Sequence, residues 1–540
     1  MRTVLLTAAA ILLATPWANS LAQPRLAVVI VVDQMRTDYL AEFAEDFDSG
    51  FARLTREGAV FTEAFHDHAL TATAPGYATV ATGMHPSRHG VVGNQTWSYE
   101  RDRLRNIVLD DSVAMVGTER LSGRSPHALT RSAIGDWLKA QHSSSKVFAV
   151  SLKDRAAVFA AGQRPDGVYW YDERAGNFVT SDYYVDALPT WVERFNDLDW
   201  VDPYFRASWL PSFDEGHDRL SHRDAEGATF SEFPHLLVGD ADTPDRRFYA
   251  RFRRTPFADL MTLDFAEAVI DAEQLGADDT PDVLMVGLSA ADYIGHRFGP
   301  WSEETHDHYA RLDEYLGDFM AHLDEEIGRD QYVLVLTADH GVMPIPEQMT
   351  SVGMSAGRTV SDDLLADLEP IVRAAVEQGV VPVMPRLGYL YGVVFDFDDA
   401  SVSEAQIDAL SNLVADYLRS RLDVATTFTE AELKTGSAAD DHWLGRYQRS
   451  YYPGRARAVT VHPVENYLIS PEARGTSHGT PYAYDARVPL VFLGAGIAPG
   501  EREGDVRTVD VAPTLAELLG IEAPKDLDGK SLAVELQQPD

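Results

Sequence analysis

Five short apolar runs, separated by segments with helical periodicity, constrain the fold of this chain more than any other feature. The runs are LAVVIVV (26–32), KVFAVS (146–151), DVLMVGL (282–288), YVLVLTA (332–338) and VPLVFLG (488–494). Each is apolar at successive positions, which is typical of parallel strands buried on both faces. One predicted helix between them carries an apolar stripe formed by Leu312, Leu316, Phe319, Leu323 and Ile327. The alternation predicts an α/β fold with a doubly wound, mostly parallel sheet and helices on both faces.

Two longer stretches interrupt this alternation. Residues 165–255 are rich in Trp, Tyr, Pro and Asp and have weak periodicity, whereas residues 355–470 contain a strand-like segment (388–396) and a helix-like segment (403–420). We interpret both stretches as insertions that form a cap over the strand ends, within a single domain of residues 23–540. A chain of 540 residues is long for one domain, but α/β folds with insertions reach this length.

The N-terminus has the features of a secretory signal peptide. Arg2 provides a positive charge, Val4 to Ala14 form an apolar segment, and Ser20-Leu21-Ala22 fits a small-x-small cleavage site. Residues 1–22 are therefore predicted to be removed, which leaves no transmembrane segment and a periplasmic or secreted protein. A retained N-terminal anchor is the alternative.

Composition disfavours several classes of partner and ligand. The net charge of −38 opposes binding to nucleic acid or anionic lipid, so we expect no nucleic-acid-binding surface. The chain has no cysteine, and hence neither disulfides nor thiolate metal ligands. Any transition metal would have to be held by His, Asp and Glu. Nothing in the sequence indicates the oligomeric state.

Polar residues follow several of the predicted strands, at the edge where ligands bind in open α/β sheets. They are Asp33 after the first run, Asp292 and His296 after the third, Asp339 and His340 after the fourth, and His478 in a late glycine-rich loop. Taken singly, an Asp after a strand is most often a helix N-cap, and Asp292 with His296 at i, i+4 is compatible with a helical salt bridge. Taken together, three Asp and three His form a ligand set suited to two divalent ions, with Zn²⁺ as the natural candidate.

A threonine lies at the start of a further predicted helix, in the segment TATAPGYATVATG (71–83). Pro75 suits the first turn of a helix, which places Thr73 at the N-terminus, where an anion is favoured. The simpler interpretation makes Thr73 an N-cap. The alternative is a hydroxyl that a bound zinc ion would help to ionise, producing a nucleophile able to attack phosphorus.

In this order, Asp33, the Thr73 segment, Asp292-x-x-x-His296, Asp339-His340-Gly341 and His478 resemble the motifs of the alkaline phosphatase superfamily over most of the chain. The resemblance implies an alkaline-phosphatase-like fold and two Zn²⁺ sites. Asp292, His296 and His478 would hold one ion. Asp33, Asp339 and His340 would hold the other, with Thr73 beside it as ligand and nucleophile. It further implies hydrolysis of small phosphate esters through a phosphothreonine intermediate.

The resemblance extends to a bacterial branch of zinc-dependent phosphomonoesterases with a threonine nucleophile. SLKDR (151–155) resembles its Lys-x-Arg element and GVVGN (90–94) its Asn element, so Asn94, Lys153 and Arg155 would hold the non-bridging phosphate oxygens. Extra cations favour monoesters, whose phosphoryl group carries more negative charge than that of a diester. The simpler interpretation pairs Lys153 and Arg155 with Asp154 and neighbouring acids.

The sequence therefore predicts an exported alkaline phosphatase that hydrolyses phosphate monoesters. A phosphodiesterase or nucleotide pyrophosphatase of the same superfamily is the first alternative, because it shares the metal ligands and the threonine and would use an aromatic-rich pocket. A non-catalytic phosphate- or metal-binding protein is the second. A sulfatase is disfavoured, since the segment around Thr73 lacks the C/S-x-P-x-R pattern.

Overall fold

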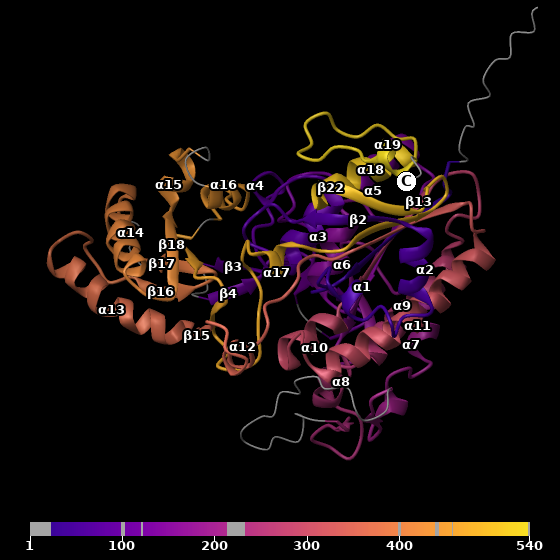
Figure 1. The fold of residues 1–540 in the computed structure, drawn as a ribbon, viewed down its shortest axis with the longest axis horizontal. Helices are drawn as coiled ribbons and strands as arrows, with labels where there is room; N and C mark the ends of the chain where they lie inside the picture. The colour runs from indigo at the N-terminus through magenta and orange to yellow at the C-terminus, as the bar shows by residue number, and fades with distance from the viewer. Residues whose placement is uncertain are drawn as a thin grey trace, which may run out of the picture.

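The computed structural model describes residues 23–98, 103–119, 122–212, 233–397, 401–437, 442–455 and 457–537. The predicted signal peptide lies outside these residues. Figure 1 shows a large α/β body and a smaller lobe to one side of it, and the lobe is built from the second predicted insertion. Within the described ranges, no helix combines the length and the apolar character that crossing a membrane requires.

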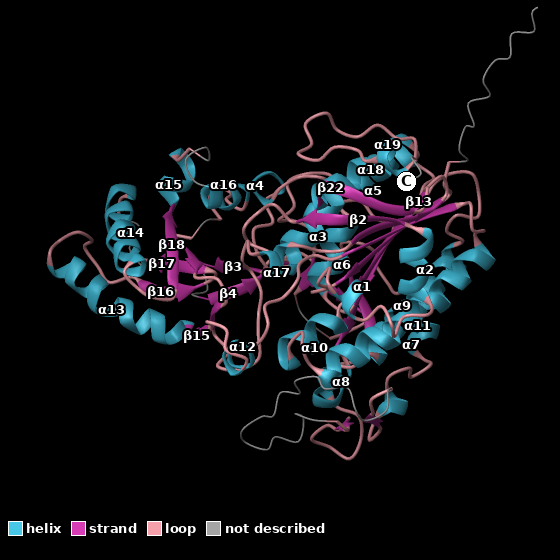
Figure 2. Ribbon diagram, in the orientation of Figure 1, coloured by secondary structure: helices cyan, strands magenta, loops and turns pink. Residues whose placement is uncertain are grey.

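A ten-stranded sheet forms the centre of the body (Figure 2). Its strands, in spatial order, are β22 (Gly500–Arg507), β2 (Ala59–Phe65), β21 (Leu490–Gly494), β14 (Tyr332–Thr337), β1 (Leu26–Val32), β13 (Asp282–Leu288), β8 (Val147–Ser151), β9 (Gly167–Asp172), β10 (Asn177–Ser181) and β6 (Met115–Val116). The central strand β1 pairs in parallel with both β13 and β14. The predicted α/β fold with a mostly parallel sheet is confirmed.

Two strands run against the others, and one of them corrects a prediction. β21 pairs antiparallel with β14 on one side and with β2 on the other. The run at 488–494 is therefore a buried strand but not a parallel one. β10 is likewise antiparallel to β9 and β6. A run of apolar residues indicates that a strand is buried on both faces. Parallel and antiparallel strands can both be buried in this way, so the residues alone do not give the direction of the strand.

Helices cover both faces of the sheet because successive residues of each buried strand point to opposite sides. The even-numbered residues of β1 (26–32) pack into one core with α2 (Gly50–Glu57), α9 (Phe257–Glu273) and α11 (Glu303–Glu326). The odd-numbered residues pack into the other with α3 (Thr73–Thr82), α5 (Ile134–Gln141), α6 (Asp154–Ala161) and α18 (Val511–Leu518). The ends of the parallel strands therefore lie between two layers of helices.

The first predicted insertion contributes to the main sheet. Within residues 165–255, β9 and β10 extend the sheet, and α7 (Thr190–Asn196) and α8 (Arg246–Phe252) follow them. The aromatic residues that weaken the periodicity, such as Tyr169, Trp170 and Phe178, are buried. The first part of this stretch is thus core rather than cap, because large aromatic side chains fill the space between sheet and helices here.

The second predicted insertion forms the lobe, which has a hydrophobic core of its own. Its four-stranded sheet consists of β16 (Arg386–Tyr389), β17 (Gly392–Asp396), β19 (Val459–Pro463) and β18 (Val424–Thr429). The helices α13 (Ser361–Glu377) and α14 (Glu404–Arg419) pack against these strands through residues such as Leu364, Leu368 and Leu410. The single strand expected at 388–396 is a hairpin, β16–β17, whose turn contains Leu390 and Tyr391.

Candidate active site

The polar residues predicted at the strand ends come together at one edge of the main sheet. They are Asp33 after β1, Asp292 and His296 on α10 (Ala290–Phe298) after β13, Asp339 and His340 after β14, and His478 in the loop between β20 (Tyr467–Ser470) and α17 (Ala483–Ala486). All are buried except His296, whose side chain is 35% exposed. One side of this cluster is therefore open to solvent.

One half of the cluster, which we call the α10 half, consists of Asp292, His296 and His478. Asp292 Oδ1 lies 3.2 Å from His296 Nε2 and 3.7 Å from His478 Nε2. One potential ligand atom of each residue lies within 4.8 Å of those of the other two. This spacing fits a single metal ion held by one carboxylate and two imidazoles.

The other half, which we call the β1 half, consists of Asp33, Asp339 and His340, all fully buried. His340 Nε2 lies 3.5 Å from Asp33 Oδ1 and 3.5 Å from Asp339 Oδ2. A second group with metal-site spacing joins Asp33 and His340 to Asp292. Asp292 therefore lies between the two halves, and either Asp292 or Asp339 could complete a site around His340.

Backbone carbonyls orient all three histidines. The Nδ1 atoms of His296, His340 and His478 lie 2.7, 2.9 and 2.7 Å from the carbonyl oxygens of Thr476, Gly341 and Thr71. Donation from Nδ1 selects the tautomer whose Nε2 lone pair is available to a metal ion. Burial and the neighbouring His478 lower the pKa of His340, and burial lowers the pKa of His478 to about 3. Both rings are thus neutral, the form that binds metal.

The negative charge of the carboxylates in the cluster is larger than the positive charge of Lys153, the cation beside them. Lys153 Nζ lies 2.7 Å from Asp33 Oδ2 and 2.5 Å from Asp292 Oδ2. Burial and the charge of Asp33 nevertheless raise the pKa of Asp339 well above its usual range. Three acids and three imidazoles that need further positive charge fit divalent ions of the zinc type.

Thr73 begins α3 and is completely buried. The N-cap of this helix is Ala72, so capping does not explain the threonine. Its Oγ1 hydroxyl has no hydrogen-bond partner among the described residues. The helix lies directly against the β1 half, since a Cβ on Gly76 would come within 2.3 Å of the Asp339 carbonyl oxygen. An unpartnered hydroxyl thus lies at the positive end of a helix whose first turns pack against Asp339 of the cluster.

The three residues predicted to hold phosphate oxygens also lie near this helix or the cluster. Asn94 Oδ1 accepts a hydrogen bond of 2.8 Å from a backbone amide in the first turn of α3. Lys153 is the N-cap residue of α6, and Arg155 follows in its first turn. The Arg155 Nε has no hydrogen-bond partner in the part of the chain that the structure describes. Asp154 forms its ion pair with Arg124 (2.6 Å), whereas Lys153 pairs with the neighbouring acids Asp33 and Asp292, as the simpler interpretation expects of this lysine.

Sequence reasoning missed Gln34, which connects the two halves. Its backbone amide donates to Asp339 Oδ1 (3.1 Å), and its side-chain Nε2 donates to Asp292 Oδ1 (2.8 Å). The backbone of Gln34 has φ = 69°, a left-handed conformation that is uncommon for a residue with a Cβ. A polar residue directly after Asp33, at the end of a buried strand, was the signal that could have identified it.

Comparison with known proteins decides the family. The sequence profile described as Type I phosphodiesterase / nucleotide pyrophosphatase matches residues 27–426. Alkaline phosphatase PafA of Elizabethkingia meningoseptica is 32% identical over 95% of this chain and 95% of its own length. The chain belongs to the alkaline phosphatase superfamily. It is a PafA-like member of the phosphodiesterase/pyrophosphatase family, which confirms the predicted superfamily.

Two further relatives are similar to this chain to the same extent. Alkaline phosphatase PhoV of Synechococcus elongatus is 32% identical over 95% of this chain and 93% of its own. A Myroides odoratus protein named a calcium-transporting ATPase is 32% identical over 96% of both chains.

Solved structures of PafA resemble this chain over nearly its whole length. The wild-type crystal structure matches with a TM-score of 0.85 and 31% identity, covering 96% of this chain and all of PafA, which confirms the alkaline-phosphatase-like fold. A second PafA crystal structure, with a TM-score of 0.84, carries substitutions of one threonine, one asparagine, one lysine and one arginine.

Proposed function

We propose that this chain is an exported alkaline phosphatase that hydrolyses phosphate monoesters, with Thr73 as nucleophile and two Zn²⁺ ions as cofactors. Its similarity to PafA and PhoV over nearly the full length makes it an alkaline phosphatase, a phosphomonoesterase. The observation that carries the choice of nucleophile is the Thr73 hydroxyl, which is buried beside the cluster and has no partner among the described residues. A buried hydroxyl without a hydrogen bond lowers stability, so its position calls for a functional reason.

In this mechanism, Thr73 Oγ1 attacks phosphorus in line with the ester bond. The bond between phosphorus and the alcohol oxygen breaks, the alcohol leaves, and the phosphoryl group stays on Thr73. Water then attacks the phosphothreonine, which releases inorganic phosphate and restores the hydroxyl. Zinc bound by the β1 half and the α10 half would supply positive charge that lowers the pKa of the hydroxyl and offsets the charge on the leaving oxygen.

Asn94, Lys153 and Arg155 would hold the non-bridging oxygens during the transfer. The substituted PafA supports this assignment, because its four altered residues are of the same types as Thr73, Asn94, Lys153 and Arg155. Its threonine and asparagine are separated by the same number of residues as Thr73 and Asn94, and its lysine and arginine are two positions apart, as Lys153 and Arg155 are.

The test combines metal analysis with a comparison of two esters. We expect about two zinc ions per chain and a kcat/KM for p-nitrophenyl phosphate on the order of 10²-fold above that for bis-p-nitrophenyl phosphate. Chelation should abolish turnover and added zinc should restore it. ATP belongs in the substrate panel, with and without calcium, because one relative is named an ATPase. Turnover that survives complete removal of metal would overturn the proposal.

A phosphodiesterase or nucleotide pyrophosphatase is the second candidate function, because the matching family profile carries that description. A diester that is hydrolysed faster than the monoester would favour it. Export is tested separately by N-terminal sequencing of protein recovered from a periplasmic or secreted fraction. We expect the mature chain to begin after Ala22, and a chain that still begins at Met1 would reject cleavage.

A further inference from the structure

A cavity of about 340 Å³ lies between the body and the lobe, and we call it the mouth cavity. Its lining includes His296 and His478 of the α10 half. Its wall combines apolar and aromatic residues, such as Leu104, Tyr389 and Tyr391, with polar residues, such as Glu472, Arg474 and Thr476. The volume lies within the range of about 300–1,000 Å³ that is usual for small-molecule sites. Since His296 is the one exposed member of the cluster, this cavity is the open approach to the candidate metal ligands.

Tyr391 is held in an unusual conformation at the turn of the β16–β17 hairpin. Its φ of 54° is left-handed, which a tyrosine rarely adopts and which recurs at functional sites. Its ring lies against Gly479, the residue after His478. A Cβ on Gly479 would meet Tyr391 Cε1 at 2.4 Å, and Gly479 itself has φ = 117°. The lobe therefore brings an aromatic ring into contact with the loop that carries a candidate metal ligand.

The Tyr391 phenol also lies close to the residues proposed to hold phosphate. Burial raises the pKa of Tyr391 to about 12, and the charges of Arg155 and Asp292 act on the phenol as well. No described residue forms a hydrogen bond with its hydroxyl. The side chain is half-buried and lines the mouth cavity as well as two smaller pockets. Its ring and hydroxyl are therefore available to a substrate.

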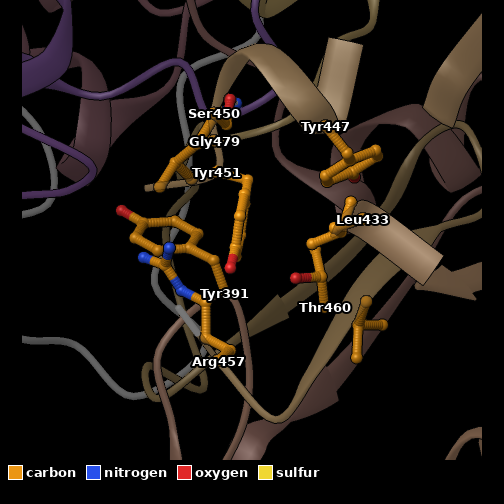
Figure 3. A pocket seen from close by; sticks show the side chains of 10 residues that line it. Tyr391, Leu433, Tyr447, Ser450, Tyr451, Arg457, Thr460 and Gly479 are labelled. Atoms are coloured by element: carbon orange, nitrogen blue, oxygen red, sulfur yellow. The ribbon is translucent and has the colours of Figure 1, made fainter. Parts of the chain in front are cut away.

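A buried arginine holds the hairpin turn from behind. Arg457 Nε donates to the Leu390 carbonyl oxygen (2.6 Å), and its Nη2 lies 3.4 Å from the carbonyl oxygen of Val92, two residues before Asn94. Figure 3 shows Arg457 and Tyr391 on one side of a second, smaller pocket, with Tyr447 and Leu433 opposite. Arg457 thus connects the turn that carries Tyr391 to the body segment that carries Asn94.

We propose that the mouth cavity binds the alcohol part of the substrate, with the Tyr391 ring as its principal contact, and that the enzyme therefore prefers monoesters of aromatic alcohols. This inference rests on the proposed function. A phosphoryl group held at the cluster leaves the mouth cavity as the open path for the alcohol. The walls offer Tyr389, Tyr391 and Leu104, which suit a flat apolar ring. Glu472 and Arg474 both line this cavity and are exposed, so their opposite charges leave the aromatic contact as the basis of the preference.

The test measures binding of two phosphonates that differ only in the group placed in the mouth cavity. Phenylphosphonate and methylphosphonate are titrated calorimetrically into zinc-loaded protein. In the wild type, we expect phenylphosphonate to bind about fivefold to tenfold more tightly. Tyr391→Asn should remove this preference, because Asn tolerates a left-handed backbone but offers no ring. Tyr391→Phe should keep most of it, since the ring carries the contact.

Tyr451→Ala is the matched control, because Tyr451 lines the smaller pocket but not the mouth cavity. It should leave the ratio of the two affinities unchanged. A Tyr391→Asn variant with the wild-type ratio, or with equal losses for both phosphonates, would overturn the inference. Because binding is measured without turnover, a failed inference is distinguishable from a failed function. Absence of monoester hydrolysis in the wild type would reject the function, whatever the two affinities are.

Discussion

The strand ends of the body and the hairpin of the lobe meet at the same cavity, but they are fixed in different ways. Asp33 and His340 are fully buried at the ends of strands that are paired on both sides and covered by two helical layers. Tyr389 and Tyr391 are half-buried and belong to a separate sheet with its own core. A rigid sheet suits metal ligands, because their spacing has to be fixed. The sequence of an inserted lobe can vary without changing that spacing.

This difference indicates a division of tasks. The body would set the chemistry at phosphorus, and the lobe would set which alcohol is accepted. Substitutions in the body should therefore lower turnover for every substrate, and substitutions in the lobe should change the ratio between substrates. Each of the following predictions tests one side of that division.

Thr73→Val should have the largest effect, because it removes only the hydroxyl that we propose as the nucleophile and keeps the shape of the side chain. We expect kcat to fall on the order of 10³-fold or more for aromatic and aliphatic monoesters alike. Stability should be retained or slightly increased, since Oγ1 has no hydrogen bond to lose among the described residues. Steady-state kinetics, metal analysis and thermal unfolding check the three expectations. A loss of less than about tenfold would remove Thr73 from the mechanism.

Arg155→Ala should have the next largest effect and should depend on the charge of the substrate. We expect kcat/KM to fall about 10²–10³-fold for p-nitrophenyl phosphate and far less for bis-p-nitrophenyl phosphate. Arg155 is the cleaner variant of the two cations, because Lys153 also pairs with Asp33 and Asp292. The double variant with Lys153→Ala should also leave Asp33 and Asp292 without their ion-pair partner, so metal analysis must accompany its kinetics. Equal losses on both esters for Arg155→Ala would exclude a role in recognising the monoester.

The body could be predicted from the sequence because its signals are local. Asp33 and Asp339 directly follow runs that are apolar at every position, and the structure places both at one edge of the sheet. The direction of the strand at 490–494 could not be predicted, since it depends on how the chain returns to the sheet. The roles assigned to the site residues remain predictions for the experiments above.

The contribution of the lobe could not be predicted, because it depends on contacts between distant segments. GYLYG (388–392) has no Asn, Asp or Pro to mark a turn, and we interpreted it as part of one strand. In the structure the turn forms where Arg457 binds the Leu390 carbonyl and Gly479 accommodates the Tyr391 ring. Two aromatic residues between two glycines were the only local indication.

Arg457→Met should produce a smaller effect that is confined to substrate preference. Burial lowers the pKa of Arg457 to about 10, and its hydrogen bonds go to backbone carbonyls of the hairpin turn and the body. Without them, Tyr391 should be held less firmly. We expect KM for phenyl phosphate to rise about threefold to fivefold, with methyl phosphate unchanged. Arg455→Met is the matched control, since Arg455 also binds body carbonyls, including that of Ala128 (2.6 Å), but not the hairpin. A rise in KM for both substrates would indicate that Arg457 stabilises the fold of the lobe in general and not the position of Tyr391.

Asp67→Asn should have the smallest effect on activity and should instead weaken the joint between body and lobe. Asp67 Oδ1 lies 2.7 Å from His85 Nε2 in the body, and its Oδ2 lies 3.3 Å from Arg507 and 3.4 Å from Arg449 of α16 (His442–Arg449) in the lobe. Arg449 Nε also donates to the Asp67 carbonyl oxygen (2.7 Å), a bond that the variant keeps. Burial opposes ionisation, but the hydrogen bond and charge of His85 outweigh it and lower the pKa of Asp67. Burial likewise opposes the charge on His85, whose pKa Asp528 and Asp67 nevertheless raise.

The sign of the pH dependence follows from these two directions. A carboxylate with a lowered pKa stabilises the fold above its unfolded pKa of about 3.9, and this contribution is lost as the pH falls towards the folded value. The raised pKa of His85 adds stability that is complete below about pH 6.5 and is lost as the pH rises through the folded value. We therefore expect wild type to exceed Asp67→Asn in free energy of unfolding by about 2 kcal/mol near pH 5.5. The difference should shrink towards about pH 3 and again above about pH 8. Denaturant unfolding of both proteins at the three pH values measures it, and a difference that stays constant between pH 5.5 and pH 3 would show that the charge of the Asp67 carboxylate does not stabilise the fold.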